Sequence, residues 1–142
     1  MGALHNAEQD NPVMTIDDFF GDQSASLHLY RVVEAYLQSL GPVRIDVART
    51  QVSFRANFMF AAVWLPQKSS PIRAKQGIGL SFSLTHPVSH PRIAPAVEVR
   101  PRRWTHHVLL EKAEDLDDDI KAWLRESYAF GSLDRQARHL LS

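Results

Sequence analysis

Apolar and polar side chains alternate with a period of two through residues 43–55, and this pattern restricts the fold more than any other feature of the chain. The alternation is interrupted only around residues 49–50. Because successive side chains of a β-strand point to opposite faces, the pattern predicts two half-buried strands. A hairpin with residues 49–50 at its tip would bring the apolar side chains onto one face and set Arg44 opposite Arg55 on the other. Arg-Thr is not a favoured two-residue turn, so a looser four-residue loop with the same pairing is equally consistent with the sequence.

Four more segments are predicted to be strands: residues 58–65, 78–84, 97–99 and 104–111. The first is apolar on both sides, as in a central strand, and the second alternates as the hairpin does. In the last segment, His106 is expected on the core face and its neighbour His107 on the open face, because adjacent strand residues point in opposite directions. The adjacent histidines therefore cannot chelate one metal ion side by side.

Two segments, residues 24–40 and 115–130, repeat apolar residues at spacings of three and four and predict amphipathic helices. Ser24 or Ser26 is expected to cap the first helix. The three aspartates at 117–119 suit the first turn of the second helix, where the helix dipole favours negative charge.

Shorter helical elements are expected near both ends of the chain. Residues 15–21 suit one capped helical turn, and residues 132–141 a short helix anchored by Leu133, Leu140 and Leu141. Together the elements predict an α+β fold, in which the two main helices pack on one face of a mainly antiparallel sheet of four to six strands. The expected core contains Tyr30, Leu37, Ile45, Phe54, Leu80, Phe82, Val108, Trp123 and Leu124.

A chain of 142 residues suits one hydrophobic core. We expect a disordered leader at residues 1–13, a single domain at 14–131 and a short C-terminal helix or tail at 132–142. The chain has no cysteine, which excludes disulfides, thiolate nucleophiles and cysteine-bound zinc, and fits a reducing cytoplasm. No apolar run approaches the roughly 18 residues that a membrane span needs. Neither a glycine-rich phosphate loop nor a nucleophile motif is present, so the sequence predicts no cofactor and no metal.

Charge is segregated along the chain although the formal net charge is zero. Residues 43–103 contain ten basic and two acidic side chains, so this middle part carries +8 and its flanks carry −8. On the predicted register the open face of the sheet is polar and cationic. Arg44 opposite Arg55 is unfavourable as a bare cross-strand pair, and an anion bridging both would relieve it. The alternative is that Asp46 and solvent balance the two charges on an ordinary wet face.

The leading hypothesis is therefore a binding module, not an enzyme, whose open face meets an anionic small molecule or protein partner. The predicted ligand-binding residues are Arg44, Arg49, Gln51, Ser53, Arg55 and His107. A second hypothesis is a small enzyme with His107 as acid or base and Arg55 as oxyanion partner. A third is a nucleic-acid accessory domain, against which the pI of about 7.1 and the acidic flanks argue. The sequence also leaves open the hypothesis of a homodimer formed through an exposed edge strand.

Several short motifs carry a resemblance to a known family. They lie at residues 15–20 (TIDDFF), 40–43 (LGPV), 49–55 (RTQVSFR), 63–66 (VWLP), 106–108 (HHV), 115–117 (DLD) and 123–124 (WL). In combination they resemble the bacterial family of domains of unknown function numbered 5655, over roughly residues 15–130. That family occurs as stand-alone proteins and at the C-terminus of proteins labelled predicted transport proteins. The resemblance implies an α+β domain without an agreed activity and supplies no catalytic residues.

Overall fold

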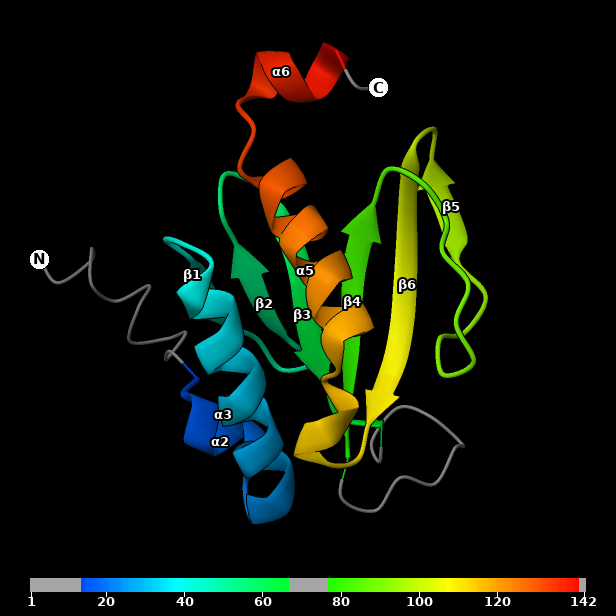
Figure 1. Ribbon diagram of the computed structural model, residues 1–142. Helices are drawn as coiled ribbons and strands as arrows, with labels where there is room; N and C mark the ends of the chain where they lie inside the picture. The colour runs from blue at the N-terminus through cyan, green and yellow to red at the C-terminus, as the bar shows by residue number, and fades with distance from the viewer. Residues whose placement is uncertain (1–13, 67–76, 141–142) are drawn as a thin grey trace, which may run out of the picture.

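The computed structural model describes residues 14–66 and 77–140, and within them it contains one antiparallel sheet of six strands (Figure 1). The strands lie in the order β1-β2-β3-β4-β6-β5, and every neighbouring pair is antiparallel. Their bounds are β1 Arg44–Val47, β2 Val52–Arg55, β3 Met59–Trp64, β4 Ile78–Leu84, β5 Val97–Arg100 and β6 Arg103–Leu110.

The two main helices cover one face of the sheet, and the other face is not covered by a helix of the described residues (Figure 1). The helical elements are α2 Ile16–Phe20, α3 Ser24–Ser39, the 3-10 turn η1 Ala113–Asp115, α5 Asp118–Gly131 and α6 Arg135–Leu140. The predicted α+β architecture is confirmed. None of the described helices is long and apolar enough to cross a membrane.

The predicted hairpin register is confirmed residue by residue. Val47 pairs with Val52, and Arg44 pairs with Arg55, so the alternation of the sequence separates into a buried and an open face. The backbone N–H of Ala48 donates to the carbonyl of Gln51 at 2.9 Å, which closes the hairpin around a two-residue tip.

The core lies between the sheet and the helices, and most of its predicted members are buried there: Tyr30, Leu37, Phe54, Leu80, Phe82, Val108 and Leu124. Ile45 and Trp123 are only half-buried, contrary to the prediction. Ile45 lies on β1, an edge strand that has a neighbour on one side only. The ring of Trp123 stacks on Phe82 at 6.3 Å and meets the His90 ring edge-on, so it packs at the border of the core and not inside it.

The helix starts show one correct and one wrong prediction. Thr15 and Asp18 form the expected capping box, and the hydrogen bonds with Thr15 lower the pKa of Asp18. Neither Ser24 nor Ser26 caps α3, whose N-cap is Gln23 without a side-chain hydrogen bond. Ser26 is instead buried in the first turn of the helix and donates to the carbonyl of Gly77, the residue before β4, at 3.0 Å.

The turn between β2 and β3 holds the C-terminal end of α5. The backbone N–H groups of Asn57 and Phe58 both donate to the carbonyl of Gly131 at 2.9 Å, and the Asn57 amide donates to the carbonyls of Ser132 and Leu133. These bonds satisfy carbonyls that a helix end leaves without intrahelical partners.

The chain then enters α6, the short C-terminal helix that the sequence predicts, but Leu140 does not anchor it as predicted. Leu140 is 76% exposed, Leu133 is half-buried, and Leu141 lies outside the described residues, as does the predicted leader at 1–13. The contacts that hold α6 come instead from Arg138, whose guanidinium lies over the ring of Phe58 at 4.0 Å.

Candidate functional site

Arginines gather at one end of the sheet. Arg44 begins β1 and Arg55 ends β2, while Arg100 ends β5 and Arg103 begins β6. Because every neighbouring pair of strands is antiparallel, all four positions lie at the same end, which we call the arginine end. Four of the ten basic residues of the segment 43–103 thus lie at one end of the sheet.

Arg44 and Arg55 form the pair that the sequence analysis predicted. They are cross-strand partners, and both reach the same carboxylate: Oδ2 of Asp46 lies 3.5 Å from Nε of Arg44 and 3.9 Å from Nε of Arg55. The side chain of Arg44 is 68% exposed and that of Arg55 37%. Nε of Arg55 is nevertheless buried and forms no hydrogen bond within the described part of the chain. Two guanidinium groups therefore share one negative charge.

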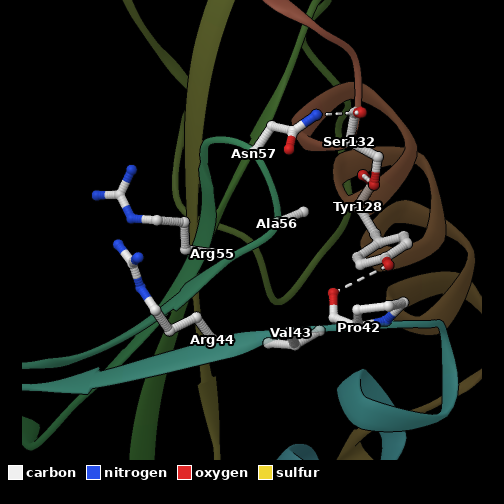
Figure 2. Close-up of a pocket in the computed structure, with 8 residues that line it drawn as sticks. All are labelled: Pro42, Val43, Arg44, Arg55, Ala56, Asn57, Tyr128 and Ser132. Carbon is white, nitrogen blue, oxygen red and sulfur yellow. Dashed lines mark hydrogen bonds between the residues drawn. The ribbon is translucent and has the colours of Figure 1, made fainter.

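An open cavity of about 550 Å³ adjoins this pair, lined by Pro42, Val43, Arg44, Arg55, Ala56, Asn57, Tyr128 and Ser132 (Figure 2). The far wall is polar and fixed. The hydroxyl of Tyr128 donates to the carbonyl of Pro42 at 3.1 Å, and the Asn57 amide donates to the carbonyl of Ser132. Figure 2 shows the side chains of Arg44 and Arg55 extending side by side, away from Tyr128. Their guanidinium groups thus reach the rim of the cavity on the open face.

The other predicted ligand-binding residues do not join this pair. Arg49 lies at the hairpin tip, at the opposite end of β1 from Arg44. The Gln51 amide donates to Ser53 Oγ at 3.0 Å and lies 3.9 Å from the sulfur of Met59, so these side chains bond one another on the open face. Neither Gln51 nor Ser53 lines the cavity beside Arg55.

His107 lies on β6, three strand positions away from β2, in a separate environment. Its Nδ1 is 2.6 Å from Ser81 Oγ, which accepts a 2.9 Å hydrogen bond from Trp64 Nε1. Because Trp64 supplies the donor to Ser81, the serine hydroxyl can donate to a neutral imidazole that carries its proton on Nε2. Burial lowers the pKa of His107, which favours this neutral form.

A cavity of about 310 Å³ opens beside the His107 ring and includes Trp64, Arg92 and Val108 in its lining. Arg55 is not part of it. The structure therefore does not bring His107 and the predicted oxyanion partner into one site.

His106 has the structural role that the sequence predicted. Its side chain is fully buried and stacks on Phe82 at 5.1 Å, and its Nε2 accepts a 3.1 Å hydrogen bond from the backbone N–H of Val88. Burial is the main cause that lowers the pKa of His106. The ring is therefore part of the buried interior.

The aspartate run at the start of α5 is also structural. Asp117 is the N-cap and accepts from the backbone N–H of Ile120, the bond that chiefly lowers the pKa of Asp117. Its other oxygen pairs with Arg92 at 2.6 Å. Among residues 14–66 and 77–140, no group of three or more histidine and carboxylate side chains is placed to hold a metal ion.

Sequence reasoning missed the polar wall of the first cavity. Helical spacing places Tyr128 on the apolar stripe of the helix predicted at residues 115–130, but the residue is half-buried and its hydroxyl donates to the carbonyl of Pro42. From the sequence, Asn57 is only a residue that tolerates a turn before the strand predicted at residues 58–65. Its contacts with Ser132 join positions 75 residues apart, and no local pattern signals such a contact.

Comparisons with known proteins give one match. A family model described as "Domain of unknown function (DUF5655)" matches residues 16–131. A search of curated proteins and a search of solved structures each found no match.

Proposed function

Since the chain belongs to the DUF5655 family of domains of unknown function, we propose its function from its own geometry: it is a non-enzymatic module that binds an anionic group between Arg44 and Arg55. The observation that supports this proposal most directly is the shared carboxylate. Asp46 faces two guanidinium groups at 3.5 and 3.9 Å and balances only one of their charges.

The physical argument rests on like charges held in register. Two cations directly opposite each other on neighbouring strands repel, and the backbone pairing keeps both side chains on the same face at neighbouring positions. A carboxylate or phosphate placed between them adds the missing negative charge and accepts hydrogen bonds from the forked N–H groups of arginine. The buried Nε of Arg55, which lacks a hydrogen bond, is one donor that such a ligand would engage.

The partner would be an anionic small molecule or an acidic side chain of a protein. The guanidinium groups lie at an exposed rim and not in an enclosed pocket, so the ligand keeps part of its hydration and the affinity is modest. Within the part of the chain that the structure describes, β1 and β5 are the edge strands of the sheet, so a second copy of the chain is one protein partner to examine. We place this function in the cytoplasm, consistent with the absence of cysteine.

A second candidate function follows from the His107 cavity. A neutral imidazole bonded to Ser81 and bordering a cavity of about 310 Å³ has the features of an acid–base residue. Among the described residues that line this cavity with His107, Arg92 is the only one with a charged side chain. If His107 is catalytic, His107→Gln abolishes turnover of any substrate found and leaves anion binding at Arg55 unchanged.

The test of the first proposal is a titration of the whole chain with succinate at constant ionic strength, followed by NMR of the arginine Nε–H groups. We expect the Nε–H signals of Arg44 and Arg55 to shift together and saturate. Arg55→Gln should weaken the affinity at least five-fold, because hydrogen bonds to charged groups are strong ones. Arg49→Gln removes the same charge from the hairpin tip and serves as the matched control. Equal loss in both variants, or no saturable shift, refutes the proposal.

A further inference from the structure

One wall of the cavity beside His107 is the side chain of Trp64, and the fold holds this ring in place. The indole Nε1 donates to Ser81 Oγ at 2.9 Å, which ties β3 to the neighbouring strand β4. The indole also meets the His107 ring edge-on, with 6.2 Å between the ring centroids. The position of this wall is therefore set by a hydrogen bond and an aromatic contact.

A second wall is formed by residues 91–94, which belong to the segment that leads into β5 and runs beside β6 (Figure 1). Backbone contacts fix this segment against β6. Ile93 forms an isolated β-bridge with Val108, and the backbone N–H of Ala94 donates to the carbonyl of His107 at 3.0 Å. Both walls are thus fixed by contacts within the chain, and a preformed cavity costs a ligand little ordering energy.

The lining of the cavity is mainly apolar and its charge is balanced. Besides His107, Arg92 is the only polar residue in the lining that the structure describes. Its Nη2 lies 2.6 Å from Oδ2 of Asp117 and donates to the carbonyl of Asp115 at 3.0 Å. The charge of Arg92 is therefore matched by a carboxylate outside the cavity. The apolar lining residues are Trp64, Pro91, Ile93, Ala94, Val108 and Leu109.

His107 contributes an uncharged hydrogen-bond donor to this lining. Its Nδ1 lies 2.6 Å from Ser81 Oγ, which accepts from Trp64, so the serine proton is directed at Nδ1 and the imidazole proton is on Nε2. Burial lowers the pKa of His107, which keeps the ring uncharged at neutral pH. Within residues 14–66 and 77–140, Nε2 of His107 has no hydrogen-bond partner, and it is not one of the buried polar atoms. The hydrogen-bonded series of Trp64, Ser81 and His107 thus ends in an accessible N–H group.

We propose that this cavity binds a small uncharged molecule made of an aromatic ring and a carbonyl group, such as an aryl ketone. The carbonyl oxygen accepts from Nε2–H of His107, and the aromatic ring packs against Trp64 and Leu109. A carbonyl satisfies the donor without bringing an ion into an apolar site, where an unpaired charge is costly. An aromatic ring gains more than its buried area from contact with a tryptophan. The volume of about 310 Å³ is at the lower end of small-molecule sites and suits one substituted ring.

This inference goes beyond the proposed anion site, because neither Arg44 nor Arg55 lines the cavity. It does not require His107 to be catalytic either, since a hydrogen bond to a carbonyl involves no proton transfer. The failure of the anion proposal, measured with succinate, therefore leaves this inference standing, and the reverse also holds.

The experiment is a titration of the whole chain with acetophenone, ethylbenzene and benzoate, followed by NMR of the histidine ring nitrogens and their protons. Acetophenone and ethylbenzene have nearly the same shape, but only acetophenone has a carbonyl group. We expect acetophenone to bind about five-fold more tightly than ethylbenzene, which is the effect of one hydrogen bond, and more tightly than benzoate. The Nε2–H signal of His107 should shift and saturate with acetophenone. The signals of His106, which is fully buried, serve as the internal control.

His107→Phe removes the donor and keeps an aromatic ring at the same position. In this variant acetophenone and ethylbenzene should bind with affinities that agree within about two-fold, because only the hydrogen bond distinguishes the two ligands. Because the variant also loses the contact with Ser81, thermal unfolding verifies its fold. If it does not fold, the wild-type preference for acetophenone, the His107 signal and the next variant decide the question.

Ala94→Trp leaves His107 intact and places a bulky side chain at an exposed position of the lining. It should weaken acetophenone binding about ten-fold, because an obstructed cavity buries less of the ligand. The matched control is Ala48→Trp, the same change at an exposed alanine beside the hairpin tip, which should leave the affinity unchanged.

Four outcomes would overturn the inference. Acetophenone that gives no saturable shift, or an Nε2 of His107 that carries no proton in the unliganded chain, excludes the proposed hydrogen bond. A preference for acetophenone that persists in folded His107→Phe excludes His107 as the donor. Equal losses in Ala94→Trp and Ala48→Trp exclude the cavity as the site. Benzoate that binds more tightly than acetophenone, with a shift at His107, excludes an uncharged ligand.

Discussion

The indole ring of Trp64 occupies the space beside Gly79 that a side chain would fill. The two residues are cross-strand partners on β3 and β4, and a Cβ added at Gly79 would overlap with the indole. This position of the ring lets Trp64 Nε1 reach Ser81 Oγ, which in turn contacts His107. A glycine in the middle of a strand weakens the strand by itself, so its value here lies in the room that it gives the tryptophan.

Gly79→Ala should therefore displace the indole and break the link to Ser81. We expect a loss of about 1–3 kcal/mol in the free energy of unfolding, as for other overpacked sites. The measurement is urea unfolding, together with the indole N–H signal of Trp64 in an NMR spectrum. In a Trp64→Ala background the same change should cost much less, since nothing remains for the new methyl group to strike. Equal costs in both backgrounds would contradict this explanation.

Asn57→Ala should loosen the joint between α5 and α6. The variant removes the amide hydrogen bonds to the carbonyls of Ser132 and Leu133, and we expect it to lose about 0.5–1.5 kcal/mol of stability. Faster hydrogen exchange at residues 135–140, measured beside unchanged exchange in α3, would confirm the local effect. If α6 exchanges at its wild-type rate, the Asn57 bonds do not hold the joint.

The buried His106 predicts a pH dependence of stability. Its folded-state pKa lies below the ordinary histidine value of about 6.5, so the unfolded chain binds the proton more readily. Stability should therefore fall as the pH drops through 6.5 toward the folded pKa, and be fully present above 6.5. His106→Gln keeps a group that can accept from Val88 but cannot titrate, and should flatten part of this slope in unfolding curves from pH 5 to 8. The pKa of His107 is also lowered, so His107 accounts for pH dependence of stability that remains in the His106→Gln variant.

Asp46→Asn should strengthen anion binding at Arg44 and Arg55. The variant removes the only carboxylate that faces both guanidinium groups in the described residues, so an incoming anion no longer competes with it. We expect a tighter succinate affinity, and a stability change within about 0.5 kcal/mol because exposed ion pairs contribute little. Weaker succinate binding in this variant would mean that Asp46 positions the arginines and does not compete with the ligand.

Phe54 and Trp123 are both predicted from the sequence to lie in the core, but they differ in burial. Phe54 is fully buried on β2, and Phe54→Ala should cost about 3–5 kcal/mol. Trp123 is half-buried, so Trp123→Ala should cost less than that despite the larger side chain. Chemical unfolding of the two variants under one condition decides the order.

The hairpin and its arginines show which features the local side-chain pattern can predict and which it cannot. The alternation of residues 43–55 predicted the register and the opposition of Arg44 and Arg55, because a strand has a period of two and one slipped residue would bury the polar set. The same logic separated His106 from His107. Spacing alone could not show that Arg49 and His107 lie apart from the Arg55 cavity, since that depends on strand order.

By itself, the sequence determined the types of the elements, the α+β class, the hairpin register and the core face of the strands in which polar and apolar residues alternate. These are consequences of side-chain periodicity, which acts over a few residues. Only the tertiary structure decided that β6 lies between β4 and β5, that Arg103 faces Arg100 across the last hairpin, and that α6 places Arg138 over the ring of Phe58. The physical reason is that strand order and helix docking follow from the burial of the whole apolar surface at once, and no short segment carries that information.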